Sequence, residues 1–425
     1  MKAIKRILGW TCIAASVLGL AGCNSGTETS DTITLTVWED ESNIDMVQEL
    51  ADDFIAEYRK KYPKAPTLKI EFLAQTEGSA IEGLVQDAET GNGGDVIAVT
   101  HDSIAAGITN GVVDAVAYPE EIRALHGEEA VDAFTLDGVI YGYPITAESI
   151  TLIYDKTQVQ DASDLESFES ILAAGLRIGM KINNDAYYTA ALLTDSRIFV
   201  DENGNVSESE LELAADQSVK NVLDFYTTYG NAGFLTSGGC ITNIEPDNSV
   251  SLIQNKTICG IITSPFMYST IIEALGEENV GVVPMPTLNG STNPFSGYKG
   301  YVVNSYSKNP YLAHALAEYL TNEESQVWRF YEKQYLPTVK SAFTENDVFT
   351  ERLEKFDEGM QENVNAFRDS LALSRPMPNI SALGNYWSTM QSAMSNFYQA
   401  GTSNTAESVA AKLNEAKTAI LAAIG

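Results

Sequence analysis

The sequence predicts an α/β protein with two lobes and a C-terminal helical segment. Strand and helix patterns alternate from residue 33 onward, the alternation returns in the middle of the chain, and the residues after 379 read as helix. With 425 residues, 44% of them hydrophobic, the chain can bury a substantial core.

An export signal is predicted at the N-terminus. Lys2, Lys5 and Arg6 precede an apolar run over residues 7–20, and small residues follow. The run has about 14 residues, whereas roughly 20 are needed to cross a bilayer as a helix. We therefore expect residues 1–22 to be a cleaved signal peptide and not a permanent transmembrane helix.

The end of this signal resembles the lipobox of bacterial lipoproteins. Leu20, Ala21 and Gly22 directly precede Cys23, whose thiol would carry the lipid. Two or more acyl chains, such as palmitate, would anchor the protein stably. Residues 23–32 are mostly polar and would form a flexible, lipid-anchored tether. The resemblance implies a location on the outer face of the cytoplasmic membrane.

The chain is strongly acidic. Its formal net charge is −32, and the predicted signal contains three basic residues and no acidic ones, so the mature chain would carry −35. Such an excess repels nucleic acid and anionic ligands and suits a neutral or cationic ligand. The acidity could equally serve only to keep an exported protein soluble.

The first α/β units follow the predicted tether. Residues 33–38 alternate as a strand, and residues after Asn43 show helical spacing up to Pro63. Three further elements complete the unit: a strand over 68–73, a helix over 79–90 and an apolar strand over 96–99.

The middle and the end of the chain give the remaining elements. Strands are expected over 176–182 and 257–263, and helices over 185–193 and 218–229. The final helix is expected to start with Asn404 as its N-cap and to bury one apolar face.

No catalytic or metal motif emerges from the sequence. The glycine-rich segment 91–95 precedes a strand and lacks the Lys-Ser/Thr of a phosphate loop, so it reads as a helix stop and turn. Segment 201–212 lacks the glycine of a calcium loop, and Asn203 with Gly204 reads better as a hairpin turn. His101, His126 and His314 are scattered. We expect no cofactor, no metal and no enzymatic activity.

Two cysteines remain beyond Cys12 in the signal and Cys23 at the anchor. Cys240 and Cys259 could form a disulfide in an oxidising compartment, or they could be an unbonded buried pair. The sequence leaves both alternatives open.

Several stretches, in order, resemble the bacterial maltose/maltodextrin-binding proteins, which belong to the extracellular solute-binding proteins. They are residues 91–102, 137–156, 283–286, 377–380 and 386–387. The resemblance implies a two-lobed periplasmic-binding-protein fold (type II), hinge-linked. It places residues 33–148 and 287–338 in lobe 1, and 149–286 and 339–425 in lobe 2, with crossings near 148–150, 283–287 and 336–341.

The resemblance also implies ligand-binding residues. Asp102, Glu148 and Asp185 stand where the family has acidic groups that bind sugar hydroxyls. Aromatic positions of the family are matched by Tyr187, Tyr188, Phe266 and Trp387. From loop position alone we add Glu41, Asn43 and Glu77.

Some positions differ from the maltose pattern. Val99 replaces a stacking tryptophan, Ser103 and Gln391 replace arginines, and the loop at 41–43 lacks the expected lysine. These changes favour a different oligosaccharide, or one that is held mostly by the second lobe.

The resemblance predicts a monomeric binding subunit that captures a maltodextrin-like oligosaccharide and delivers it to the permease of an ATP-driven importer. Two alternatives remain. One is a binder of peptides, polyamines or anions on the same fold, with anions disfavoured by the charge. The other is an exported glycosidase.

Replacing Cys23 with Ala should abolish lipid modification, because the thiol is the acceptor in a lipobox. The measurement is incorporation of radiolabelled fatty acid into wild type and Cys23→Ala. Label still entering the variant would contradict the assignment of the anchor.

Overall fold

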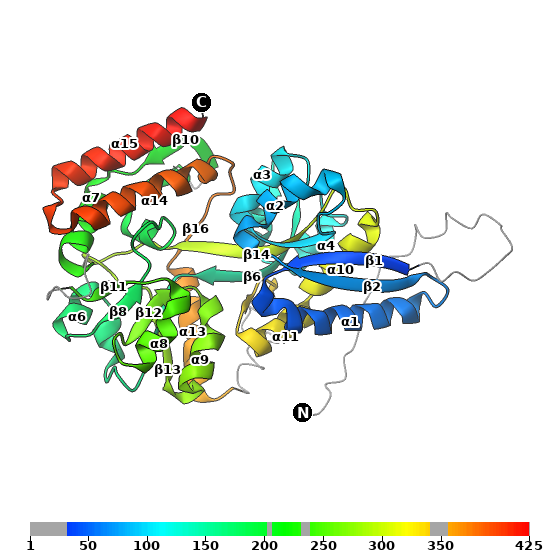
Figure 1. Cartoon of the computed structure of the whole chain (residues 1–425), viewed down its shortest axis with the longest axis horizontal. Coiled ribbons are helices and arrows are strands. Elements are labelled where there is room, and N and C mark those ends of the chain that lie inside the picture. Colours follow the sequence, from blue (N-terminus) through cyan, green and yellow to red (C-terminus); the bar gives the residue numbers. More distant parts are fainter. Residues whose placement is uncertain (1–31, 202–205, 231–238, 341–355, 425) are drawn as a thin grey trace.

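Two β-sheets organise the chain, and they lie in separate halves of the protein (Figure 1). The structure is a computed structural model that describes residues 32–201, 206–230, 239–340 and 356–424. Helices and strands alternate through both halves, which confirms the predicted α/β class. The signal peptide, Cys23 and the tether up to residue 31 lie outside the described residues.

The first sheet has seven strands in the order β15-β6-β14-β3-β1-β2, with β16 paired to β14. Their bounds are β1 Thr32–Glu39, β2 Thr67–Ala74, β3 Val96–Thr100, β6 Gly142–Ser149, β14 Phe295–Val303, β15 Leu336–Pro337 and β16 Arg375–Pro376. Strand β1 is parallel to β2 and β3, whereas β14 is antiparallel to β3 and β6. The three strands predicted before residue 100 are confirmed.

Helices cover both faces of the first sheet, as the helical spacing requires. One face packs against α1 (Ile44–Lys61) and α10 (Pro310–Thr321), and the other against α2 (Ala80–Asp87) and α3 (Ile104–Thr109). The surrounding elements are α4 Pro119–Leu125, α5 Glu128–Ala133, the β4 (Thr135–Leu136) and β5 (Val139–Ile140) hairpin, and α11 Glu323–Lys333.

The second sheet has five strands in the order β11-β8-β12-β7-β13. Their bounds are β7 Thr151–Asp155, β8 Ile178–Met180, β11 Ile241–Asn243, β12 Gly260–Thr263 and β13 Val280–Pro284. Strands β8, β11 and β12 are parallel, and β7 is antiparallel to β12 and β13. The strands predicted over 176–182 and 257–263 are therefore confirmed, although both are shorter than predicted.

Helices also cover both faces of the second sheet. One face packs against α8, α9 and α13, and the other against α6, α7, α14 and α15. Their bounds are α6 Phe168–Ala173, α7 Asp216–Asp224, α8 Ser249–Gln254, α9 Tyr268–Leu275, α13 Glu358–Ala372, α14 Leu383–Ala400 and α15 Ala406–Ile424. The helix predicted over 218–229 continues from α7 as the π-helix η7 (Phe225–Tyr229).

The helix predicted over 185–193 is wrong in type and length. The segment forms only the 3₁₀-helix η6 (Tyr188–Leu192). The Arg375 guanidinium donates to the carbonyl oxygens of Ala190 at 3.0 Å and Leu193 at 3.4 Å. Arg375, which is distant in sequence, thus binds carbonyl oxygens that would accept backbone hydrogen bonds if the α-helix continued.

The predicted N-cap of the last helix is also wrong. The helix begins at Ala406, and Thr405 Oγ1 accepts from the Ser408 amide at 3.2 Å. Asn404 instead donates to the carbonyls of Phe397 and Gly401, because the preceding 3₁₀ turn brings these within reach.

Strands β9 (Arg197–Val200) and β10 (Val206–Glu212) form an antiparallel pair beside α15. They flank the hairpin turn predicted at Asn203 and Gly204, which itself lies outside the described residues. An antiparallel pair supports the hairpin interpretation over a calcium loop.

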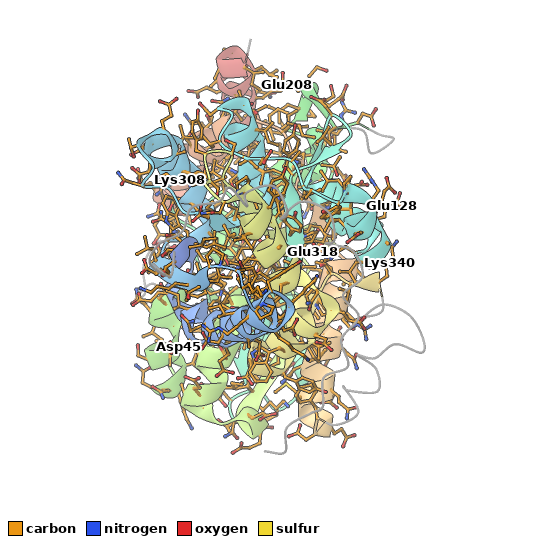
Figure 2. All side chains as sticks on the ribbon, turned by 90° about the vertical axis from the view of Figure 1, so that its right-hand side faces the viewer. Asp45, Glu128, Glu208, Lys308, Glu318 and Lys340 are labelled. Atoms are coloured by element: carbon orange, nitrogen blue, oxygen red, sulfur yellow. The ribbon has the colours of Figure 1, made fainter. Side chains whose placement is uncertain are left out.

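The exterior of the described chain is rich in charge. Figure 2 shows acidic side chains such as Asp45, Glu128 and Glu208 at the periphery, and all three are exposed. Among the described residues, no helix combines the length and apolar character needed to span a bilayer.

The buried Asn363 fastens α13 to the edge strand β13. Its Oδ1 accepts from the Val282 amide at 2.9 Å, and its Nδ2 donates to the Val280 carbonyl and the Tyr268 hydroxyl. Asn363→Ala would leave these groups unpaired and should lower the free energy of unfolding by about 1–3 kcal/mol. Urea unfolding of this variant beside the exposed Asn414→Ala tests the effect. Equal losses in both variants would contradict it.

Candidate functional site

The carboxyl ends of four first-sheet strands lie along one edge. Strands β1, β2 and β3 are parallel, and β6 runs in the same direction because both β3 and β6 are antiparallel to β14. Polar residues at or just beyond these ends are Glu39, Asn43, Glu77, Asp102 and Glu148. Ligands of α/β sheets bind beyond the carboxyl ends of the strands, so this edge is the candidate site.

The second sheet presents its own carboxyl ends to the same place. Only Ile150 separates β6 of the first sheet from β7 of the second. The first residue of β7, Thr151, pairs with Thr263 at the end of β12, and its hydroxyl donates to the Thr263 carbonyl at 3.3 Å. The end of β6 therefore lies beside the end of β12. We call this region the junction.

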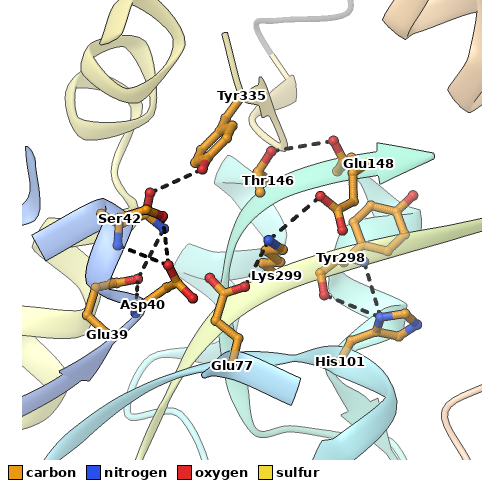
Figure 3. A network of polar contacts seen from close by, with 12 residues as sticks. Glu39, Asp40, Ser42, Glu77, His101, Thr146, Glu148, Tyr298, Lys299 and Tyr335 are labelled. Atoms are coloured by element: carbon orange, nitrogen blue, oxygen red, sulfur yellow. Dashed lines mark hydrogen bonds and ion pairs between the residues drawn. The ribbon is translucent and has the colours of Figure 1, made fainter. Parts of the chain in front are cut away.

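A largely enclosed lysine occupies the first-sheet side of the junction (Figure 3). Lys299 Nζ lies 2.8 Å from Glu77 Oε2 and 3.7 Å from Glu148 Oε2, and the three side chains are 11–16% exposed. Sequence reasoning named both carboxylates and missed the lysine. The available signal was a single lysine within the otherwise uncharged strand β14.

The three charges perturb one another. Burial lowers the pKa of Lys299, but Glu148 and Glu77 outweigh it and hold that pKa well above its usual value. Burial raises the pKa of Glu148, and the attraction of Lys299 opposes the rise. The lysine is therefore charged across the physiological pH range.

A second polar network orders the loop after β1. Glu39 accepts from the Tyr301 hydroxyl, which in turn accepts from Arg329 Nη2 at 2.9 Å. Burial raises the pKa of Glu39, and Arg329 opposes this. Asn43 Nδ2 donates to Glu39 Oε1 at 3.4 Å, and Asn43 Oδ1 accepts from Tyr335 at 3.1 Å. Asn43 is thus a buried structural link in this network.

Tyr335 reaches the junction because α11 ends at Lys333 and the next residue, Gln334, has a left-handed backbone with φ 55° that reverses the chain. The chain then turns into β15, which pairs with β6 next to Glu148. Burial raises the pKa of Tyr335 to about 12, so its hydroxyl stays a hydrogen-bond donor.

The second sheet contributes an acid and two tyrosines. Asp185 is buried and accepts from the Thr189 amide at 3.1 Å. The rings of Tyr187 and Tyr188 meet edge to face with centroids 5.3 Å apart. Burial and the nearby Glu148 charge raise the pKa of Tyr187, while a hydrogen bond with Ser264 lowers it. Tyr187 thus lies within electrostatic reach of the first-sheet carboxylate.

The two remaining predicted aromatics lie on separate elements. Phe266 is in the 3₁₀-helix η9 (Pro265–Met267) after β12 and is 36% exposed. Trp387 is half-buried on α14, with its ring edge-on to Phe295 at the start of β14, centroids 5.9 Å apart. Phe266 thus lies just beyond the carboxyl end of β12, and Trp387 packs against the end of β14 that pairs with the carboxyl end of β6.

Asp102 and Glu41 are less enclosed. Asp102 follows the fully buried His101, whose Nδ1 accepts from the Tyr298 amide at 3.1 Å and whose Nε2 lies 3.1 Å from the Met377 carbonyl. That histidine fixes the turn that carries Asp102. Glu41 lies exposed in the turn after β1.

The disulfide considered for Cys240 and Cys259 is wrong, since both are buried free thiols. The residues directly precede β11 and β12, and β8 runs between those strands. Adjacent strands are about 4.8 Å apart, so a strand in between puts the Cα atoms beyond the roughly 7 Å limit for a disulfide. Burial raises the pKa of Cys240 to about 12 and of Cys259 to about 11.

The described residues contain no group of three His, Cys, Asp or Glu side chains placed to hold a metal ion. The acidic and aromatic groups at the junction are instead suited to binding hydroxyl groups and apolar ring faces.

Comparisons with known proteins show a family and a shared fold. Residues 53–355 match the family described as bacterial extracellular solute-binding protein. The galactooligosaccharide-binding protein of Bacillus subtilis is 24% identical over 93% of this chain and 92% of that relative. The maltodextrin-binding protein MdxE of the same organism is 26% identical over 90% and 91%. The Thermus thermophilus maltotriose-binding protein, solved with maltotriose, superposes with a TM-score of 0.74 at 22% identity, over 92% of this chain and 100% of that one.

Asp185 should make the stability depend on pH. Burial raises its pKa from 3.8 to about 6. The folded protein thus holds this proton more tightly than the unfolded chain, so stability falls as pH rises from about 4 through about 6. Asp185→Asn keeps an acceptor for Thr189 and should remove this fall, gaining about 2–3 kcal/mol at neutral pH.

Urea unfolding between about pH 4 and about pH 7 measures this difference. The exposed Asp195→Asn is the matched control and should follow wild type. A wild-type pH slope retained in Asp185→Asn would refute the assignment.

Proposed function

The chain belongs to the bacterial extracellular solute-binding proteins, and we propose that it captures a neutral oligosaccharide at the junction between its two sheets. The observation that carries the proposal is the Lys299–Glu77–Glu148 cluster, whose Glu148 and Lys299 lie within electrostatic reach of Tyr187 in the segment after β8 of the other sheet. Carboxylates accept hydrogen bonds from sugar hydroxyls, and aromatic rings pack against the C–H-rich faces of sugar rings.

The charges at the junction favour a neutral ligand. Lys299 is already bound between two carboxylates, and Arg329 donates to Tyr301 beside Glu39. Lys299 is therefore already paired and Arg329 is 2% exposed, so neither cation is open to a carboxylate or phosphate ligand. An anionic sugar would instead meet Glu77, Glu148 and Asp185, at a cost in binding energy.

The relatives support an oligosaccharide. Two of them are named for galactooligosaccharide and maltodextrin, and a solved neighbour holds maltotriose. We propose a ligand of this class, maltodextrin-like in the first instance. Asp102, Glu148, Asp185 and Glu77 would bind its hydroxyls, and Tyr187, Tyr188, Phe266 and Trp387 its ring faces.

We propose further that the chain makes and breaks no bond. Residues 33–148 with 287–338 and residues 149–286 with 339–425 would act as two lobes that close about the hinge, and the closed form would be read by an importer permease. A lipid on Cys23 would hold the monomer at the outer face of the membrane, and streptococcal relatives are named as lipoproteins.

A thermal-shift panel tests the proposed function. Maltotriose, a galactotriose, spermidine, a neutral tripeptide and a uronic-acid oligomer are each added to the mature chain. Only a ligand that binds the folded state raises the melting midpoint. A shift with the neutral trisaccharides alone is expected. A shift with spermidine or peptide alone, or release of monosaccharide from the trisaccharides, would replace the proposal with an alternative.

Truncating the aromatic groups should weaken binding more than folding. Phe266→Ala and Trp387→Ala should each lose on the order of 2 kcal/mol of binding free energy, roughly thirtyfold in affinity. Calorimetric affinity and the unliganded melting temperature are measured together. Tyr311→Ala, an aromatic 74% exposed on α10, is the control and should change neither. A large drop in melting with unchanged affinity would assign the rings to the core.

A further inference from the structure

Lys299 lies in an unusual place for a lysine. It is in the interior of the first sheet, where its backbone pairs with Thr100 of β3 on one side and Thr146 of β6 on the other. Its side chain is 14% exposed. A lysine so enclosed must be paired, because removing an ammonium group from water is costly.

Its partners come from two different elements. Glu77 opens the 3₁₀-helix η2 (Glu77–Ser79) beyond β2, and Glu148 is the penultimate residue of β6. The ammonium lies 2.8 Å from the first carboxylate and 3.7 Å from the second. Two carboxylates that share one cation lie only a few ångströms apart, and without it one of them would take up a proton.

We propose that Lys299 is a positioning residue for the solute, which fixes the carboxylates of Glu77 and Glu148 as a pair of ionised acceptors for sugar hydroxyls. This inference rests on the proposed function. A carboxylate accepts through both oxygens, so each can bind the lysine and still accept from a hydroxyl. Without the lysine, one of the two carboxylates would be protonated and would donate a hydrogen bond where it now accepts one. The cluster would then bind a different arrangement of sugar hydroxyls.

Other ionisable groups face the cluster. Tyr335 comes from the end of α11, and Tyr187 and Tyr188 from the second sheet, all three with raised pKa values owing chiefly to burial. The Glu77 charge raises the pKa of Glu39 on β1, which accepts from Tyr301 and is attracted by Arg329, and Glu39 in turn raises the pKa of Tyr335. Asp185, with a pKa of about 6, acts on Tyr188. Because their pKa values are raised, the three tyrosines stay neutral hydrogen-bond donors between about pH 5 and about pH 8. The net charge of the cluster is therefore set by the carboxylates and Lys299.

The test compares Lys299→Met with Lys299→Arg, wild type and Lys308→Met, a lysine exposed on the outer surface (Figure 2). Calorimetric affinity for maltotriose and a galactotriose is measured between about pH 5 and about pH 8. Lys299→Met should bind at least tenfold more weakly at the acidic end than at the basic end. The other three proteins share the titration of Asp185, whose pKa is about 6, so their affinities should change alike with pH and at least about threefold less than that of Lys299→Met.

The sign follows from the carboxylates. Removing Lys299 raises the pKa of one carboxyl, so the acceptor pair exists only above that pKa and binding strengthens as pH rises. Glu77→Gln combined with Lys299→Met removes the repulsion between the two carboxylates, so this variant should fold readily and return to the pH dependence of wild type. An affinity and a pH profile of Lys299→Met that match those of wild type would overturn the inference.

A ligand-free measurement separates this inference from the proposed function. A carboxyl whose pKa is raised in the folded protein contributes stability at low pH and loses it as pH rises. The melting temperature of unliganded Lys299→Met should therefore fall with rising pH more steeply than that of wild type. Wild type that binds neither trisaccharide would overturn the proposed function, whatever this slope. Wild type that binds, beside a Lys299→Met protein with wild-type slope and affinity profile, would overturn the role of Lys299 alone.

Discussion

The passage of the chain through one residue, Ile150, constrains the whole molecule. It joins the last residue of β6 in one sheet to the first residue of β7 in another. Consecutive Cα atoms are about 3.8 Å apart, so the two strand ends cannot separate. Because β6 is parallel to β3 and β7 is antiparallel to β12, the carboxyl edges of both sheets must face the same space. The loops that follow the parallel strands, and with them the polar residues, are gathered there.

Buried charges at this junction are organised for geometry more than for stability. Arg329 lies beside Glu39, linked through Tyr301, and Lys299 lies between Glu77 and Glu148. Burying an ion pair costs desolvation energy that its attraction barely offsets, so such pairs are weak stabilisers. They do fix side-chain direction. Their concentration at the strand ends, with apolar clusters on the sheet faces, is what a binding surface requires.

Elements encoded locally could be predicted from the sequence, and those set by distant partners could not. Strands β1, β2 and β3 alternate or are uniformly apolar, and their prediction is confirmed. The segment after Asp185 has helical spacing but forms a 3₁₀ turn, because Arg375 from far along the chain takes its carbonyls. Lys299 could not be predicted as a site residue because both of its carboxylate partners, Glu77 and Glu148, are remote from it in sequence. The loop position of Glu77 predicts it as a candidate ligand residue, but its ion pair with Lys299 is visible only in the structure.

The charge of the junction differs in kind from the charge of the whole chain. The protein carries −32, and much of this excess lies on exposed side chains such as those in Figure 2. A surface field steers charged ligands and leaves the encounter with a neutral one unchanged. At the junction, by contrast, Lys299 lies within hydrogen-bonding distance of Glu77, and Arg329 is linked to Glu39 through the Tyr301 hydroxyl, so both cations offset carboxylate charge locally. A neutral polyhydroxyl ligand would therefore sense the local pattern of donors and acceptors and not the overall acidity, which is left to maintain solubility.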